Sequence, residues 1–342
     1  MNRLLTVFIC AVWICMSSCS DAGRANPDVE LLSSMGSKFR LENEKIAQEL
    51  HNKLKTDSVD VTAMLGLAEM NVFRYIFGLS SREETMPQAL AATKQAWQID
   101  SLSCKSITLN GIMHFLDWNW AEARRAFEMA INTDPLDPAV RHWYSLLLCA
   151  TTGRFDLAML QSDTIMELDP SGDYQIGRGS LLYFARRNTE LRDLMLETIA
   201  QDPSVPWGYD WLGMAYIELE DYDKSIKTYE KAFTLSDGLV EVGGGLGHAL
   251  GMAGMYKPAK FMADFYTDAA QEKYLPPVQR AFIHIGIGEH DQALDLLEQA
   301  YREKSWFIIF IQIEPWYDPI RQDPRFEALV QQMRFPIRVS QH

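Results

Sequence analysis

A small or apolar residue recurs along this chain at a nearly constant interval of 34 residues. The successive gaps are 34, 35, 33, 34, 34 and 34 residues, and the positions are Ala89, Ala123, Ala158, Leu191, Ser225, Ala259 and Ala293. A second recurring position follows each of these by seven residues, at Ala96, Ala130, Ile165, Thr198, Ala232, Tyr266 and Ala300. A spacing of seven keeps two side chains on the same face of a helix. The recurrence predicts a stack of similar units in which each unit buries its apolar face against its neighbours.

Each unit has the sequence pattern of two helices joined by a tight turn. Apolar residues in the second helices are three or four residues apart, as in Ile226, Tyr229 and Phe233. In the turns a glycine closes one helix and a ring opens the next, at residues 153–155, 254–256 and 288–290. Asp-Pro pairs end three units, at residues 134–135, 169–170 and 202–203. No alternating run is long enough for a strand, so we expect an all-α solenoid of stacked antiparallel helix pairs.

Beyond its period, the chain carries several short motifs. They are DWNWAEA at 117–123, HWY at 142–144, GRF at 153–155 and EPWYDPIRQDPRF at 314–326. With these motifs, residues 47–335 resemble the tetratricopeptide repeats that follow winged-helix regulators, adenylate cyclases and Ser/Thr kinases in bacteria. The resemblance implies a right-handed superhelix and a non-enzymatic binding role, without the catalytic or DNA-binding functions of those proteins. It also implies that the tail closes the array as a cap.

The boundaries of the array follow from the same pattern. Ala47 lies 42 residues before Ala89, and we attribute the eight extra residues to a loop over residues 78–87. This gives a capping helix or half-repeat over 38–57, seven repeats over 58–304 and a C-terminal cap over 305–342. Within the cap, Asp323 is a good N-cap for a helix with Pro324 in its first position. On that helix Phe326, Leu329 and Met333 share a face and can cover the last repeat.

The first residues of the chain are typical of an export signal. Residues 4–16 form an apolar run of 13 residues, whereas a membrane span needs about 20. The Ser17-Ser18-Cys19 sequence that follows resembles the lipobox of bacterial lipoproteins. That resemblance implies a signal peptide over 1–18, a lipid on Cys19, a tether over 19–37 and, because Ser20 follows, an outer-membrane location in the cell envelope, facing the periplasm or the surface. A signal that is cleaved without lipidation, or not cleaved, is the alternative.

Several kinds of chemistry are disfavoured by the sequence. With 46 acidic and 32 basic residues the formal charge is −14, which argues against nucleic-acid binding. The histidines are scattered, and Cys104 and Cys149 fall at opposite ends of successive first helices, so we expect no disulfide, metal or cofactor. The GGGLG sequence at 243–247 lacks the preceding strand of a phosphate loop. We interpret it as a loose, flexible helix start.

The concave side of the predicted array is rich in large apolar side chains. The candidate groove residues are Ile112, Phe115, Trp143, Leu147, Tyr183, Phe184, Trp207, Asp210 and Met214. Such a lining suits an extended peptide or an amphipathic helix. Two other occupants are possible, because the rings can pack between adjacent helices and the chain's own segment 28–57 can fill the groove. Only Lys105 fits the basic pattern of repeats that clamp a C-terminal carboxylate, so we expect no such clamp.

Two functions follow from this groove. The first is a membrane-tethered scaffold that binds unidentified protein partners and has no enzymatic activity. The alternative is a lipoprotein that binds a glycan or small ligand, with Trp143, Tyr183 and Trp207 stacking on its rings.

Overall fold

A computed structural model describes residues 37–169 and 174–337, and every element in these residues is helical. The predicted all-α solenoid is therefore confirmed. The predicted signal peptide, Cys19 and most of the tether lie outside the described residues. No helix in the described part of the chain is both long and apolar enough to cross a membrane.

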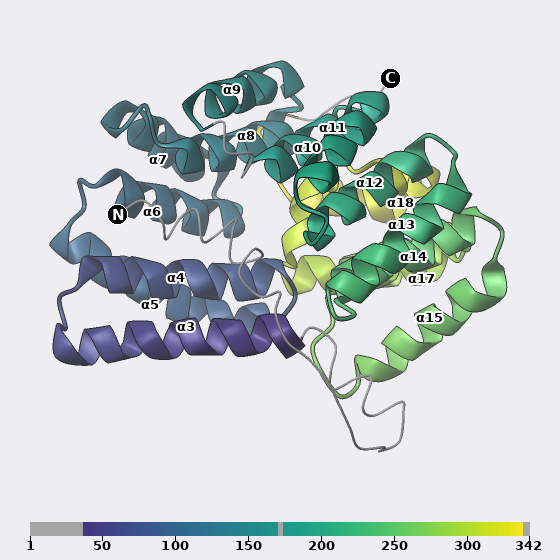
Figure 1. The fold of residues 1–342 in the computed structure, drawn as a ribbon, viewed down its shortest axis with the longest axis horizontal. Coiled ribbons are helices and arrows are strands. Elements are labelled where there is room, and N and C mark those ends of the chain that lie inside the picture. The colour runs from purple at the N-terminus through teal and green to yellow at the C-terminus, as the bar shows by residue number, and fades with distance from the viewer. Residues whose placement is uncertain (1–36, 170–173, 338–342) are drawn as a thin grey trace.

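Successive helices pack as antiparallel pairs that follow one another around a superhelix (Figure 1). The described residues hold a leading helix, α3 (Ser37–Thr56), and seven pairs. The pairs are α4 (Val61–Ile76) with α5 (Arg82–Ile99), α6 (Cys104–Leu116) with α7 (Trp120–Thr133), α8 (Pro138–Thr152) with α9 (Phe155–Leu168), α10 (Gln175–Phe184) with α11 (Asn188–Gln201), α12 (Pro206–Glu218) with α13 (Tyr222–Leu235), α14 (Val240–Met252) with α15 (Tyr256–Ala269), and α16 (Pro277–Gly286) with α17 (His290–Arg302). The seven recurring residues from Ala89 to Ala293 all lie on the second helices and are fully buried.

The turns within the pairs repeat one backbone conformation. Gly153, Gly254 and Gly288 have φ values of 61°, 74° and 77°, in the left-handed region, where glycine has no steric penalty. The next helices begin two residues later, as the sequence predicts. Trp118 and Arg186 take the same conformation in other pairs. These two residues carry side chains, so the left-handed turn at these positions could not be predicted from the sequence.

The predicted loop over residues 78–87 is shorter than expected. Helix α5 already begins at Arg82. The Ser81 side chain accepts a hydrogen bond from the Glu84 backbone, and the Glu84 side chain accepts one from the Ser81 backbone. This reciprocal capping box starts the helix within the predicted loop, five residues before the loop's end at residue 87. Pro87 lies inside the helix, in its second turn, where it has no backbone N–H to donate to the preceding turn.

The glycine-rich segment at 243–247 is a tightly packed helix rather than a loose start. Residues 243–245 lie buried in α14, close to α16. A Cβ atom on Gly244 would lie 2.7 Å from the backbone oxygen of Gln279, and one on Gly251 would lie 2.4 Å from the backbone carbon of Gly286. The absence of side chains on these glycines lets the two helices approach until their backbones are in contact.

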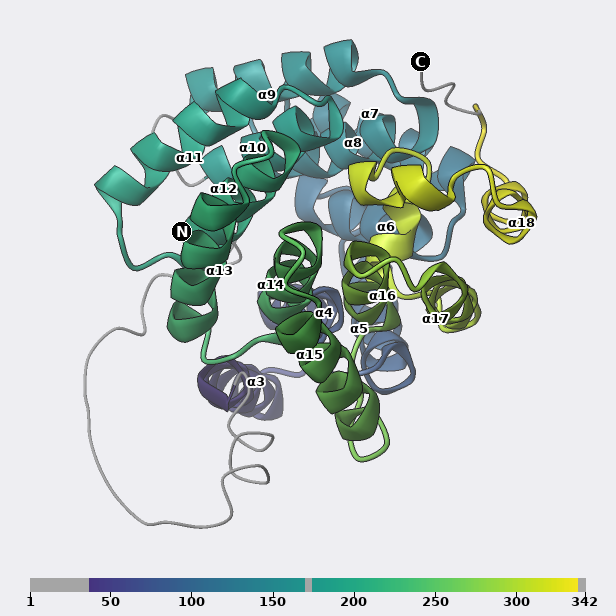
Figure 2. The ribbon, with the colours of Figure 1, turned by 90° about the vertical axis from the view of Figure 1, so that its right-hand side faces the viewer.

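The C-terminal segment turns back into the superhelix. Two short 3₁₀ helices, η1 (Trp306–Phe310) and η2 (Pro315–Ile320), lie on the concave side (Figure 2), where η1 contacts α4, α8 and α17 and η2 contacts α16. Helix α18 (Pro324–Gln332) then packs against α17, with Asp323 capping it. Phe326, Leu329 and Met333 are buried, as the sequence predicted.

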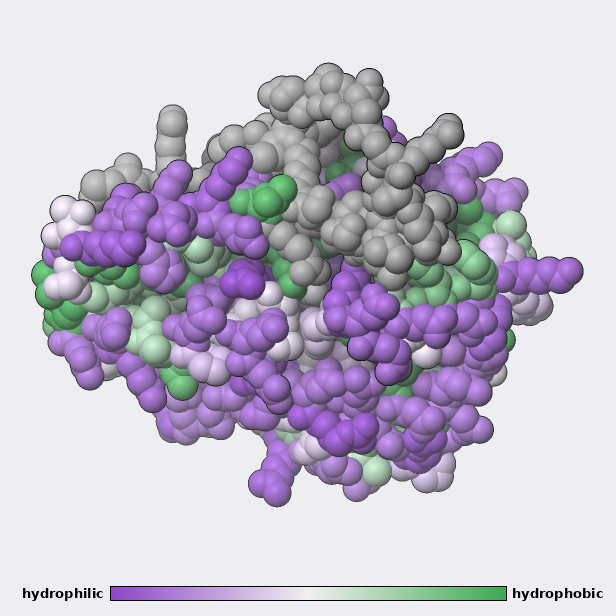
Figure 3. Space-filling view, turned by 90° about the horizontal axis from the view of Figure 1, so that it is seen from below, coloured by the Kyte–Doolittle hydropathy of each residue, from purple (hydrophilic) through white to green (hydrophobic). Residues whose placement is uncertain are grey.

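The described part of the N-terminal segment does not fill the groove. Helix α3 packs on α4, with Leu50 buried between them. Residues 37–57 of segment 28–57, which was one possible occupant of the groove, therefore lie elsewhere, against α4. The face of the molecule seen in Figure 3 is mostly hydrophilic, with apolar residues scattered over it.

Candidate functional site

The C-terminal segment packs its aromatic side chains directly on the predicted groove. The Trp306 ring lies 6.1 Å from the rings of both Phe115 and Trp143, edge to face. Phe310 stacks on Phe184 with ring centres 4.7 Å apart. Offset and edge-on ring pairs of this kind add to the stabilisation from burial. Residues 306–310 thus occupy space that an external peptide would need.

The second turn makes equally close contacts on the other side of the groove. Trp316 stacks on His248 at 4.1 Å and meets the face of Phe282 at 4.8 Å. Burial lowers the pKa of His248 to about 4, so its imidazole is neutral at physiological pH. Its Nδ1 atom lies 2.8 Å from the backbone oxygen of Phe282, which fixes the ring under Trp316.

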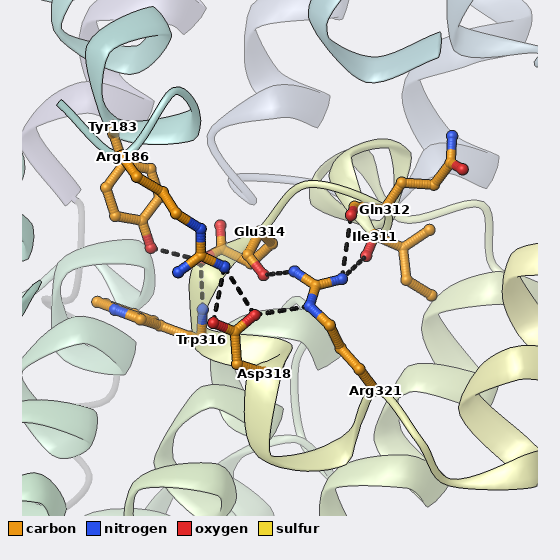
Figure 4. A network of polar contacts seen from close by, with 8 residues as sticks. All are labelled: Tyr183, Arg186, Ile311, Gln312, Glu314, Trp316, Asp318 and Arg321. Atoms are coloured by element: carbon orange, nitrogen blue, oxygen red, sulfur yellow. Dashed lines mark hydrogen bonds and ion pairs between the residues drawn. The ribbon is translucent and has the colours of Figure 1, made fainter. Parts of the chain in front are cut away.

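A polar network holds the segment between these two sets of rings (Figure 4). The Tyr183 hydroxyl donates to the carboxyl of Glu314, which also accepts the backbone N–H of Trp316 at 3.1 Å. Arg186 donates to both carboxylate oxygens of Asp318, at 2.7 and 2.8 Å. Arg321 donates to Asp318 at 2.6 Å as well as to backbone oxygens within the segment. Tyr183 of α10 and Arg186 of the turn that follows it thus tie this part of the array to the cap.

Glu314 is the buried centre of this network. It is 0% exposed, and burial raises its pKa to about 8, although its hydrogen bonds to Tyr183 and Trp316 favour ionisation. The native state therefore holds a proton on Glu314 at pH values where the unfolded chain has lost it. Stability from this proton is lost as the pH rises from about 4.5 through 8.

We expect Glu314→Gln to flatten the fall in stability between pH 6.5 and 8.0. In this range native His142 and His248 are already neutral, since their pKa values are about 4. The amide keeps an oxygen acceptor for Tyr183 and has no proton to lose. Urea unfolding at both pH values should show a decrease smaller by about 1–2 kcal/mol in the variant. Equal decreases in both proteins would mean that Glu314 is ionised when folded.

The structure buries all nine predicted groove residues. Phe115, Leu147 and Tyr183 lie among the rings of the core and the cap. The other six line a chamber of about 410 Å³ on the concave side: Ile112, Trp143, Phe184, Trp207, Asp210 and Met214. Specific small-molecule sites are of this size, with mostly apolar walls and a few placed polar groups.

The chamber wall combines aromatic rings with polar groups. Glu69 and Lys105 form an ion pair of 3.0 Å at one part of it, and burial raises the pKa of Glu69 to about 7. Asp210 and Gln279 line it from α12 and α16, and each has a side-chain oxygen to which no described residue donates a hydrogen bond. The described residues contain no group of three potential ligands that could hold a metal ion.

Several wall residues were not predicted from the sequence. Phe77 ends α4 and lies 4.7 Å from the ring of Trp207, across the superhelix. Trp306 and Phe310 come from the cap, which was expected to cover the last repeat only. Of these residues, Trp211 could have been predicted from the sequence, because it directly follows the predicted groove residue Asp210 on a first helix.

Comparisons with known proteins agree with this architecture. A tetratricopeptide-repeat family model matches residues 208–238, which span α12 and α13. A tetratricopeptide repeat protein from Parabacteroides merdae is 14% identical, over 77% of this chain and 100% of its own, with a TM-score of 0.51. Yeast Tom70 is 16% identical, over 96% of this chain and 72% of its own, with a TM-score of 0.48.

These identities are low, so the structural likeness concerns the fold. The family model identifies one repeat, and the same helix pair recurs before and after it with the same buried residues. One repeat is therefore matched by the family model, and the array as a whole has the fold of a tetratricopeptide-repeat solenoid, with its C-terminal segment folded into its own concave side.

Proposed function

We propose that this chain is a non-enzymatic binding protein, lipid-anchored at Cys19 in the cell envelope, that binds a small ligand in its concave chamber. The observation that carries the proposal is the chamber itself, of about 410 Å³ and lined by rings with a few polar groups. A peptide or helix bound in the groove would have to displace Trp306, Phe310 and Trp316 from the core. A small molecule can enter the remaining space without disturbing them.

The proposed lipid anchor and the proposed lack of enzymatic activity are supported by different observations. The lipobox resemblance at residues 16–19 supports lipidation, and the acidic composition supports the absence of a nucleic-acid partner. The repeat pattern accounts for nearly all of the chain, and tetratricopeptide repeats bind rather than catalyse. We therefore propose binding as the activity, with the lipid holding the chamber at the membrane surface.

Compounds that occupy the chamber should raise the melting temperature. Ligand binding to the native state stabilises it by about 2.7 kcal/mol at a concentration one hundred times Kd, which is a shift of several degrees for a chain of this size. Neutral glycans, organic amines and aromatic carboxylic acids make a suitable panel for thermal-shift measurements on the full chain.

Two matched variants test whether the shift in melting temperature comes from binding in the chamber. Ala139 is buried and lines the chamber, so Ala139→Phe should fill part of the space and abolish the shift. Phe261 is 72% exposed on α15, and Phe261→Ala should leave the shift unchanged. If no compound stabilises the native chain, or if Ala139→Phe responds equally, the chamber is not a ligand site.

A second candidate function is a scaffold for protein–protein interactions, which the tetratricopeptide-repeat match suggests in general terms. Because the cap fills much of the concave side, protein partners would contact the outer faces. Tyr256 and Phe261 on α15 are exposed aromatic side chains there. In a crosslinking pull-down from envelope membranes, a scaffold should capture the same proteins with the native and Ala139→Phe baits. It should lose them with Tyr256→Ser/Phe261→Ser.

A further inference from the structure

The charged groups that line the chamber are mainly acidic. Two basic side chains are present, and one of them, Lys105, is paired with Glu69 at 3.0 Å. The other, His142, is neutral because burial lowers its pKa to about 4. The acidic residues in the lining are Glu69, Asp137, Asp202, Asp210 and Glu241. A chamber with this balance repels carboxylates and phosphates and attracts cations.

Asp210 is the acidic group with the strongest need for a partner. Its side chain is 8% exposed, and no described residue donates a hydrogen bond to its Oδ1 atom. Burial without a neighbouring cation raises its pKa to about 7. A buried carboxylate is costly unless it is paired. A ligand that brings a positive charge to this point would remove that cost.

Aromatic rings line the same chamber as Asp210. Trp207 and Trp211 lie one turn before it and directly after it on α12, and both line the chamber. Phe77 approaches Trp207 from α4, with ring centres 4.7 Å apart and planes inclined by 43°. The faces of such rings attract ammonium groups, and indoles do so most strongly. A chamber lined by a carboxylate and several aromatic rings has the groups that recognise alkylated ammonium ions.

We propose that the chamber binds an organic cation, a quaternary or protonated amine, with its nitrogen next to Asp210 and its alkyl groups against Trp207, Trp211 and Phe77. This inference rests on the proposed small-ligand function and specifies the ligand's chemistry. Neutral glycans would also find rings and acceptors here, but they would leave the buried carboxylate without a countercharge.

The test compares a cation with its uncharged carbon analogue on the full chain. Choline and 3,3-dimethyl-1-butanol have nearly the same shape and differ in the charge of the central atom. Isothermal titration calorimetry at pH 7.5 should give a dissociation constant for choline about tenfold lower than for the alcohol, because cation–π and carboxylate contacts act on the cation alone. This comparison needs no variant and is unaffected by folding defects.

Asp210→Asn should reduce the preference for choline to within about twofold. The variant should fold at least as well as the native chain, since it removes an unpaired buried charge. Asp163, which is exposed and pairs with Arg178 at 2.6 Å outside the chamber, provides the control, and Asp163→Asn should keep the full preference.

The other outcomes each overturn the proposal. Equal affinities for choline and the alcohol would make the chamber a general apolar site. An unchanged preference in Asp210→Asn would place the cation elsewhere. If glycans from the thermal-shift panel bind and choline does not, the ligand class is wrong but the small-ligand function stands. If neither the panel nor choline binds, both proposals fail.

Discussion

Replacing Trp316 with alanine is expected to lower the free energy of unfolding by about 3–5 kcal/mol, as for other buried tryptophans. Trp316 is 3% exposed and packs between His248 and Phe282. Its loss would leave a cavity where the cap meets α14 and α16. It would also weaken the backbone hydrogen bond from residue 316 that orients the carboxyl of Glu314. Urea unfolding followed by far-UV circular dichroism at pH 7 measures the difference directly.

The control for this substitution is Phe261→Ala, which removes an aromatic ring of comparable size from an exposed position. We expect it to change stability by no more than about 0.5 kcal/mol. A loss below about 1 kcal/mol for Trp316→Ala would contradict the packing of the C-terminal segment inside the superhelix. The groove would then be available to an external peptide, and the proposal of a small-ligand chamber would have to be abandoned.

Gly251→Ala is expected to destabilise the chain by about 1–3 kcal/mol, even though alanine favours helices. The added Cβ would lie 2.4 Å from the backbone carbon of Gly286. A backbone atom cannot rotate away as a side chain can, so α14 and α16 would have to separate. Urea unfolding of the variant gives the cost of that separation.

The matched control is Gly66→Ala, the same substitution within a different helix. There the Cβ would approach only the flexible end of Leu50, at 3.2 Å. We expect this variant to be neutral or more stable by up to about 1 kcal/mol, because alanine has the higher helix propensity. If both variants change stability by the same amount, the close approach of α14 and α16 has no energetic importance.

Much of the fold was predictable because its signals are local. The recurring residues from Ala89 to Ala293 gave the repeat, and the glycines at 153, 254 and 288 gave the turns. Asp323 and Pro324 gave the last helix. Each of these signals acts within one helix, one turn or one pair of neighbouring helices, so residues close in sequence are enough to specify it. The Ser81–Glu84 capping box is an equally local signal, because it depends on two residues three apart in the sequence.

The candidate site was only partly predictable. The repeat positions on the first helices placed Trp143, Trp207 and Asp210 on the concave side. They did not predict which residues these three would contact there. The tight packing of the glycines at 243–247 could not be predicted locally, because their partner, α16, lies a full repeat away. The chamber was not foreseen at all, since Phe77 and Trp306 come from opposite ends of the array.

The sequence by itself determined a stack of helix pairs, because short-range periodicity decides which residues each helix buries. The tertiary structure alone decided that the superhelix curves far enough to bring α4 close to α12 and to enclose the C-terminal turns. That curvature is the sum of small rotations between successive pairs, and no single repeat encodes it. It also places Asp210 in a chamber lined by rings, where none of the described residues donates to its Oδ1 atom, and this makes the chamber a binding site to test.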